Sequence, residues 1–164
     1  MNNVTATYLG IAIGFIVTGF LSYTYLKPYL NKKNISIALI ALIVPHAFRF
    51  IALQLFSAQA TGLVVSDTGR DLIAYGDVLS ALFAVVALWA INKKASWTKA
   101  VVWSFVVFAF TDLSIAVMRS MTEELSKTAD PVLFLVSSVY VPFLFMTLFL
   151  LFEMLIKRKK ELAF

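Results

Sequence analysis

The chain has 164 residues, of which 61% are hydrophobic and only 14% are charged, and its formal net charge is +5. A soluble domain carries roughly a quarter charged residues, so this composition excludes an ordinary soluble protein. The absence of cysteine excludes disulfides, thiolate metal sites and cysteine nucleophiles, and a single histidine, His46, excludes zinc sites built from several imidazoles.

Five apolar runs are long enough to cross a membrane. Crossing about 30 Å of hydrocarbon at about 1.5 Å per residue needs roughly 20 residues. The runs cover residues 8–26, 35–56, 72–92, 100–120 and 131–156, and residues 57–63 are an alternative extension of the second. We therefore predict an all-α fold, a compact bundle of five transmembrane helices that forms a single domain over residues 1–164.

The first run carries small residues four positions apart, beginning with Gly10 and Gly14. Because no hydrophobic effect drives helices together in lipid, small residues that allow close backbone approach favour helix association. We predict a packing seam at these two glycines. A seam within the chain is favoured over a seam between copies, although a homo-oligomer is also expected because five helices enclose little interior.

The second, third and fourth runs each carry a charged residue at a similar depth. Counted from the outer ends at about 1.5 Å per residue, Arg49 lies roughly 10 Å deep, Asp77 roughly 7 Å and Asp112 roughly 12 Å. Ionisable residues in a membrane are costly, and by default they face the bundle interior and mark a functional site. We predict one polar layer of a cation and two anions, which is either functional or only a salt-bridged clasp between helices.

Two further residues accompany this layer. His46 precedes Arg49 by three residues and follows Pro45, so it lies one turn deeper, where it is either a proton carrier or a hydrogen-bonding partner for a carbonyl that the proline frees. Arg119 follows Asp112 by seven residues on nearly the same helix face. Its long side chain is expected to reach the layer and balance the second carboxylate.

The polar connection before the third run contains Ser66, Asp67, Gly69, Arg70 and Asp71. Such residues favour turns and helix N-termini. Because Asp71 stands directly before the apolar residues, we predict that it caps the third helix.

Basic residues reveal the expected orientation. The first connection, the third connection and the tail share one side and carry Lys27, Lys32, Lys33, Lys93, Lys94, Lys99, Lys157, Arg158, Lys159 and Lys160. By the positive-inside rule, this side is cytoplasmic and the N-terminus is outside, which predicts a multi-pass protein of the cell (inner) membrane. The basic residues flank apolar segments and form no polar face, so nucleic acid is not an expected partner.

The polar layer supports several functions. The first expectation is a channel or transporter for an ion, proton or small polar solute reached from outside, because intramembrane charges most often serve transport. The alternative is a membrane enzyme or a binding subunit for a lipid, quinone or haem, and a further alternative is an accessory subunit of a membrane complex. Catalysis is less favoured because the interior offers few polar residues, and no residue pattern identifies a cofactor.

Overall fold

The structure, a computed structural model, describes residues 2–127, 130–158 and 161, and every regular element within these ranges is helical. In chain order the elements are α1 (Asn3–Leu21), η1 (Ser22–Leu26), α2 (Lys27–Asn31), α3 (Ile35–Ile43), η2 (Val44–Leu53), α4 (Gln54–Ala60), α5 (Asp67–Lys93), α6 (Thr98–Thr122), η3 (Leu125–Lys127), α7 (Pro131–Leu135), η4 (Val136–Tyr140) and α8 (Val141–Lys157). The segments η1 and η4 are π-helical turns, whereas η2 and η3 are 3-10 helices.

These elements join into five continuous helices that are long and apolar enough to cross a membrane: Asn3–Asn31, Ile35–Ala60, Asp67–Lys93, Thr98–Thr122 and Pro131–Lys157. The predicted all-α class and the number of membrane-length helices are confirmed. The helices extend beyond the apolar runs because polar residues outside the runs cap them. Asn2, for example, accepts a hydrogen bond from the backbone of Thr5, and Asn34 accepts one from Ser36.

The cap of the third helix differs from the prediction. Ser66, and not Asp71, is the N-cap, because its Oγ accepts a 2.9 Å hydrogen bond from the backbone N–H of Gly69. Asp71 lies inside the first turns of α5, where its carboxylate pairs with Arg70. The apolar pattern alone placed the start of α5 too late in the sequence, because the first turn of a helix tolerates polar residues that face solvent.

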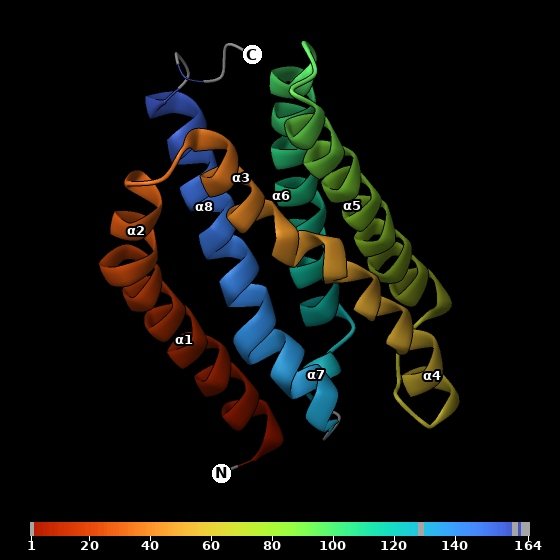
Figure 1. Cartoon of the computed structure of the whole chain (residues 1–164). Coiled ribbons are helices and arrows are strands. Elements are labelled where there is room, and N and C mark those ends of the chain that lie inside the picture. The colour runs from red at the N-terminus through yellow and green to blue at the C-terminus, as the bar shows by residue number, and fades with distance from the viewer. Residues whose placement is uncertain (1, 128–129, 159–160, 162–164) are drawn as a thin grey trace.

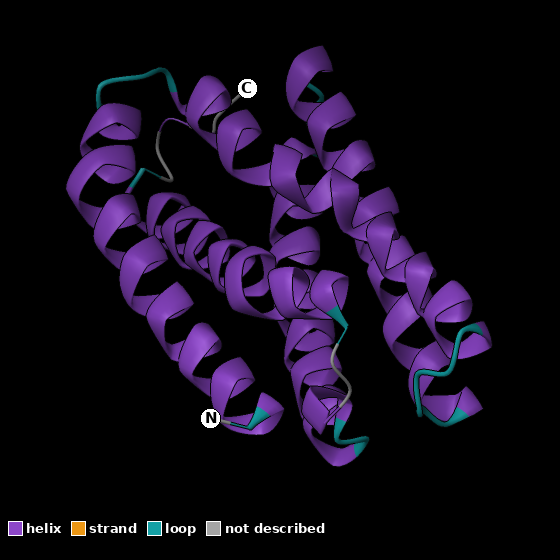
Figure 2. Cartoon of the chain, turned by 90° about the horizontal axis from the view of Figure 1, so that it is seen from below, coloured by secondary structure: helices purple, strands orange, loops and turns teal. Residues whose placement is uncertain are grey.

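We number the five membrane-length helices in chain order. The third helix (α5) lies between the second (α3, η2 and α4) and the fourth (α6). The first (α1, η1 and α2) packs mainly on the fifth (α7, η4 and α8), as Figures 1 and 2 show. Small residues explain the close contacts of α5, because Ser80, Ala84 and Ala87 are fully buried on one face. Two apolar clusters fill the bundle. The larger one includes Leu42, Phe105 and Leu148, and the smaller one joins residues at the end of the bundle that holds the start of α5, such as Leu55, Ile73, Ala116 and Leu125.

The two glycines of the first helix pack within the chain, against the fifth helix. Pro142 has no backbone N–H to offer the carbonyl of Ser138, so the preceding turn widens into the π-helical segment η4. The freed carbonyl faces α1 at Gly14, where an added Cβ would collide with it. Gly10 lies against the ring of Phe134 in the same way. The predicted packing seam is therefore intramolecular.

The second helix changes its geometry in the middle. From Val44 to Leu53 it is a 3-10 helix, which begins where Pro45 removes one α-helical hydrogen bond. Ten residues make an unusually long 3-10 segment, and such segments often mark functional or strained regions. With three residues per turn, His46 and Arg49 stand directly above one another on the buried face.

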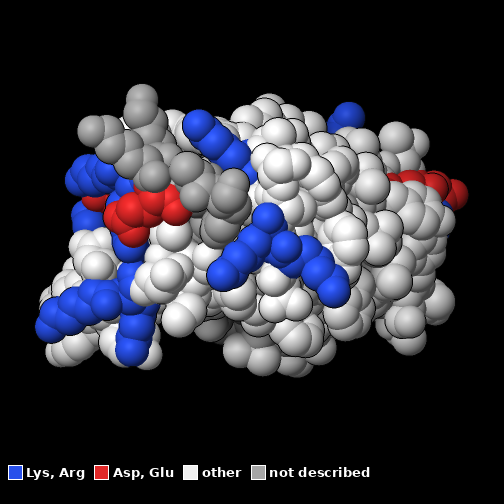
Figure 3. All heavy atoms as spheres, turned by 45° about the horizontal axis from the view of Figure 1, so that its top comes forward, with Lys and Arg blue, Asp and Glu red and all other residues white. Residues whose placement is uncertain are grey.

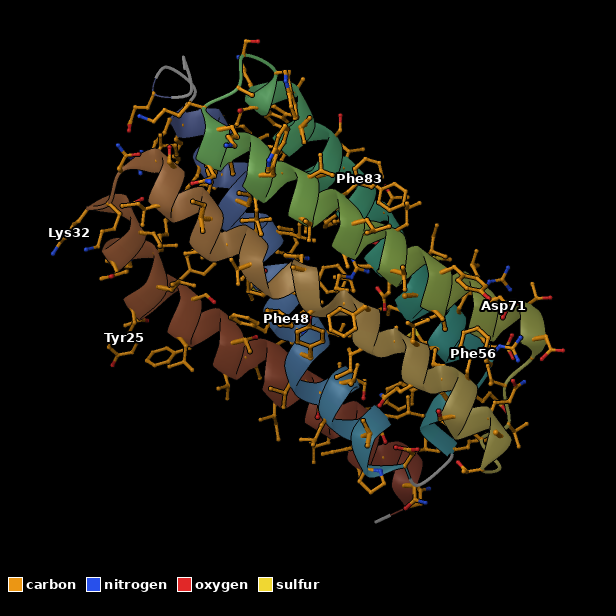
Figure 4. The ribbon with its side chains drawn as sticks, turned by 45° about the vertical axis from the view of Figure 1, so that its right-hand side comes forward. Tyr25, Lys32, Phe48, Phe56, Asp71 and Phe83 are labelled. Atoms are coloured by element: carbon orange, nitrogen blue, oxygen red, sulfur yellow. The ribbon has the colours of Figure 1, made fainter. Side chains whose placement is uncertain are left out.

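Basic side chains gather at the end of the molecule that holds α2 and the C-terminal ends of α5 and α8 (Figure 3). Lys32 and Asp71 lie at opposite ends (Figure 4). At the basic end, the Glu153 carboxylate accepts ion pairs from Lys157 at 2.6 Å and from Lys27 at 2.8 Å, which ties the first helix to the fifth. Two residues of the predicted basic tail, Lys159 and Lys160, lie outside the described residues.

Candidate functional site

Arg49 joins three helices in one polar layer. Its side chain is 1% exposed. Nε donates a 2.7 Å hydrogen bond to Oδ1 of Asp77 on α5, and Nη2 donates one of 2.7 Å to Oδ2 of Asp112 on α6. Nη1 donates to the carbonyl of Ala109 at 3.3 Å. The structure thus brings together the three charges that the sequence placed at one depth.

Two residues of α5 that the sequence analysis did not assign to the site hold the Asp112 carboxylate in place. The hydroxyl of Ser80 donates a 2.7 Å hydrogen bond to Asp112 Oδ2, the same oxygen that Arg49 binds. Gly76 lies against Oδ1, where an added Cβ would collide with this oxygen. A glycine inside a helix often permits another group to approach the backbone closely. The position of Gly76 directly before Asp77 was therefore a signal in the sequence that a group from another helix lies against α5 here.

His46 lies one turn from Arg49, as expected, where it packs edge-on against the ring of Phe105 on α6 and forms its hydrogen bond with the fifth helix. Thr147 donates its only hydroxyl hydrogen to the carbonyl of Leu144 at 2.8 Å. Its oxygen therefore accepts from His46 Nε2 at 3.0 Å, which places the imidazole proton on Nε2. Nδ1 of His46 is buried and has no partner in the described part of the chain. A second N–H would have no acceptor there, so the geometry suits a neutral ring.

The hydrogen bond near Pro45 comes from Tyr140. The hydroxyl of Tyr140 donates a 2.6 Å bond to the carbonyl of Pro45, and this contact joins the 3-10 segment of the second helix to the π-helical turn of the fifth. The alternative in which His46 bonds a freed carbonyl is therefore not what the structure shows. Two irregular segments meet at Tyr140, directly beside the polar layer.

Arg119 lies apart from the layer. It is exposed in the last turn of α6, whereas the described partners of Asp112 are Arg49 and Ser80. The expected balance of the second carboxylate is therefore not seen, and the positive charge of Arg119 instead favours the ionised form of Glu123. Within the described residues, no group of three or more His, Asp or Glu side chains could hold a metal ion.

Glu123 fixes the N-terminal end of the third helix, α5. Its carboxylate accepts 2.6 Å and 3.0 Å hydrogen bonds from the hydroxyl and the backbone N–H of Ser66. These bonds favour the ionised form, so they hold the pKa of Glu123 below its usual value. Gly69 permits this approach, since an added Cβ would collide with the carboxylate.

A chamber of about 430 Å³ lies beside the polar layer, in the half of the bundle that holds the start of α5, and residues of all five membrane-length helices line it. Sequence reasoning did not find this chamber, because side chains from every helix contribute to it. Most of these are apolar, while Asp77 contributes a polar group from the layer and Tyr140 one from beside it. Apolar lining residues include Ile11, Phe15, Ile51, Leu55, Ile73, Leu113, Val117, Leu133, Phe134, Val141, Leu144 and Phe145.

The size and lining of the chamber fit a small organic molecule. Ligand sites in proteins typically enclose about 300–1,000 Å³, have mostly apolar walls and carry a few polar groups that fix orientation. Here one of the polar groups, Asp77, belongs to the layer that Arg49 holds together. The arrangement can hold an apolar body with one polar end.

Comparison with known proteins gave one match. The family described as "Domain of unknown function (DUF8737)" matches residues 6–156, a range that contains both the polar layer and nearly all of the chamber lining. No curated protein and no solved structure matches the chain.

Proposed function

The chain belongs to the DUF8737 family, and we propose that it is a multi-pass membrane protein that binds an amphipathic, lipid-like molecule. The observation that carries this proposal is the chamber of about 430 Å³, whose walls are mostly apolar and whose polar groups include Asp77 and Tyr140. The apolar body of the ligand occupies the chamber, and its polar end meets the layer.

Packing favours binding over conduction of an ion or polar solute, which was the first expectation from the sequence. The larger apolar cluster extends from beside the layer toward the basic end, and residues such as Leu42, Phe105 and Leu151 are fully buried in it. Arg49 is committed to two carboxylates and a backbone carbonyl. A hydrated path through the layer would have to break these contacts and open this cluster.

The proposed orientation has the N-terminus outside and the C-terminus in the cytoplasm of a cell (inner) membrane. Its support is the gathering of Lys and Arg at one end of the bundle (Figure 3). In this orientation the chamber lies in the outer half of the membrane. The ligand therefore enters from the outer leaflet or the outer surface.

Photocrosslinking tests the proposal. A photoactivatable long-chain alcohol is added to membranes that contain the protein, with or without excess unlabelled alcohol. Chamber residues such as Ile11 and Leu113 should be labelled, and the unlabelled alcohol should compete this labelling away. Exposed residues such as Ile16 and Val107, which face away from the chamber, should be labelled without competition. Labelling of Ile11 and Leu113 that resists competition would contradict a binding site.

A further inference from the structure

Resting on the proposed function, we propose that the ligand carries a protonated amine and that Asp77 binds this ammonium group at the polar end of the chamber. The proposal names the chemical class of the ligand: an amphiphile with a cationic nitrogen head and an apolar tail. Charge, geometry and the character of the walls support it independently.

The first observation is the charge of the layer. Arg49 is a single cation between two anions, Asp77 and Asp112, so the layer retains one uncompensated negative charge. Such a charge is costly in a dry or membrane interior unless a counter-charge pairs with it. A ligand cation supplies that pairing. A proton on one carboxylate is the competing way to neutralise the layer, and a neutral ligand would then bind equally well.

The second observation is the free side of Asp77. Its Oδ1 accepts from Arg49, whereas Oδ2 has no hydrogen-bond partner among the described residues. Asp77 lines the chamber, and Asp112 does not. A ligand in the chamber can therefore meet the uncompensated negative charge at Oδ2 of Asp77.

The third observation concerns the walls. The described lining includes the acids Asp77 and Asp130 but no Lys, Arg or His. Asp130 is engaged as the N-cap of α7, where its Oδ1 accepts from Val132 and Leu133. The chamber thus repels an anionic head group. The ring of Tyr140 also lines it, and an aromatic face attracts a cation.

Equilibrium binding tests the proposal with two probes of the same tail length. Tritiated dodecylamine, whose amine is protonated at pH 7 as that of lysine is, is compared with tritiated dodecanol. Both are bound to the protein in lipid nanodiscs, and empty nanodiscs give the background. The wild-type protein should bind dodecylamine at least about tenfold more tightly than dodecanol, because a hydrogen bond to a charged group is stronger than a neutral one.

Asp77→Asn keeps the size of the side chain and removes its charge, so both probes should bind the variant with similar affinity. Retained dodecanol binding shows that the variant is folded. Asp67→Asn is the matched control, since it removes an exposed acid of the same helix outside the chamber and should keep the preference.

Equal binding of the two probes to the wild-type protein would overturn the ammonium assignment and leave the chamber as a neutral-lipid site. A preference for dodecylamine that survives Asp77→Asn would also overturn it. Failure of both probes to bind saturably to the wild-type protein would contradict the proposed function itself.

Discussion

Arg49 Nε donates a 2.7 Å hydrogen bond to Asp77 Oδ1, and this contact joins the irregular middle of the second helix to the third helix. Because Arg49 is 1% exposed and also holds Asp112, its removal leaves two carboxylates without their cation. Breaking a buried pair in this way costs about 3–5 kcal/mol. Arg49→Ala should therefore lower the melting temperature in detergent substantially.

Removing the whole charged set should be less harmful than removing Arg49 alone. Buried ion pairs can often be replaced by apolar residues of similar size without loss of stability. The combined Arg49→Met, Asp77→Leu and Asp112→Leu protein should therefore regain much of the melting temperature that Arg49→Ala loses. A triple variant less stable than Arg49→Ala would mean that the layer is held by more than mutual charge compensation.

Gly14 should tolerate no side chain, because an added Cβ would collide with the backbone carbonyl of Ser138. Overpacking of this kind costs about 1–3 kcal/mol, so Gly14→Ala should lower thermal stability. Gly19→Ala is the matched control on the same helix, since the nearest atom to its Cβ is Met146 Sδ at 3.8 Å. This variant should be neutral or slightly stabilising.

The same pair of variants bears on the predicted homo-oligomer. The structure places Gly14 against the fifth helix of its own chain, so Gly14→Ala should leave the native mass of the purified protein unchanged. A shift to a smaller oligomer, without loss of melting temperature, would show that the glycines form a seam between copies.

Acid should weaken the contact between the start of α5 and the end of α6. The pKa of Glu123 in the folded protein lies below its ordinary value, because Ser66 donates two hydrogen bonds to the carboxylate. Its stabilising contribution is present above the unfolded pKa and is lost as pH falls through the lower folded pKa. In Glu123→Gln, melting temperature should fall less between pH 6 and pH 3 than in the wild type. Identical pH profiles would contradict this assignment.

Orientation can be tested cleanly because the chain has no cysteine of its own. Single cysteines at Asn3 or Asp67 should react with an impermeant thiol reagent added outside intact cells, and cysteines at Asn31 or Ala95 should react only after permeabilisation. The opposite pattern would reverse the proposed topology.

Sequence reasoning predicted the polar layer because depth along a membrane helix follows from residue counting, and Arg49, Asp77 and Asp112 lie at matching depths. It did not predict the contacts that depend on irregular backbone. Pro45 lies in a 3-10 segment and Pro142 follows a π-helical turn, and the hydrogen bond that Tyr140 makes between these two segments depends on both.

Side-chain partners across helices were also beyond the sequence. The rotation of one helix against another decides whether His46 faces a carbonyl or the hydroxyl of Thr147. The chamber could not be predicted from the sequence either, because it exists only where helices from all parts of the chain surround one space.

A bulky side chain placed inside the chamber tests directly whether the chamber holds the ligand. Ala6 lines the chamber from α1, whereas Ala12 is exposed on the same helix and lies outside the lining. Saturable binding of tritiated dodecylamine to nanodiscs is measured for Ala6→Phe and for the matched control Ala12→Phe. We expect Ala6→Phe to weaken binding at least about tenfold, since the ring takes up ligand volume, and Ala12→Phe to bind as the wild type does. Wild-type binding by a folded Ala6→Phe protein would contradict the claim that the chamber holds the ligand.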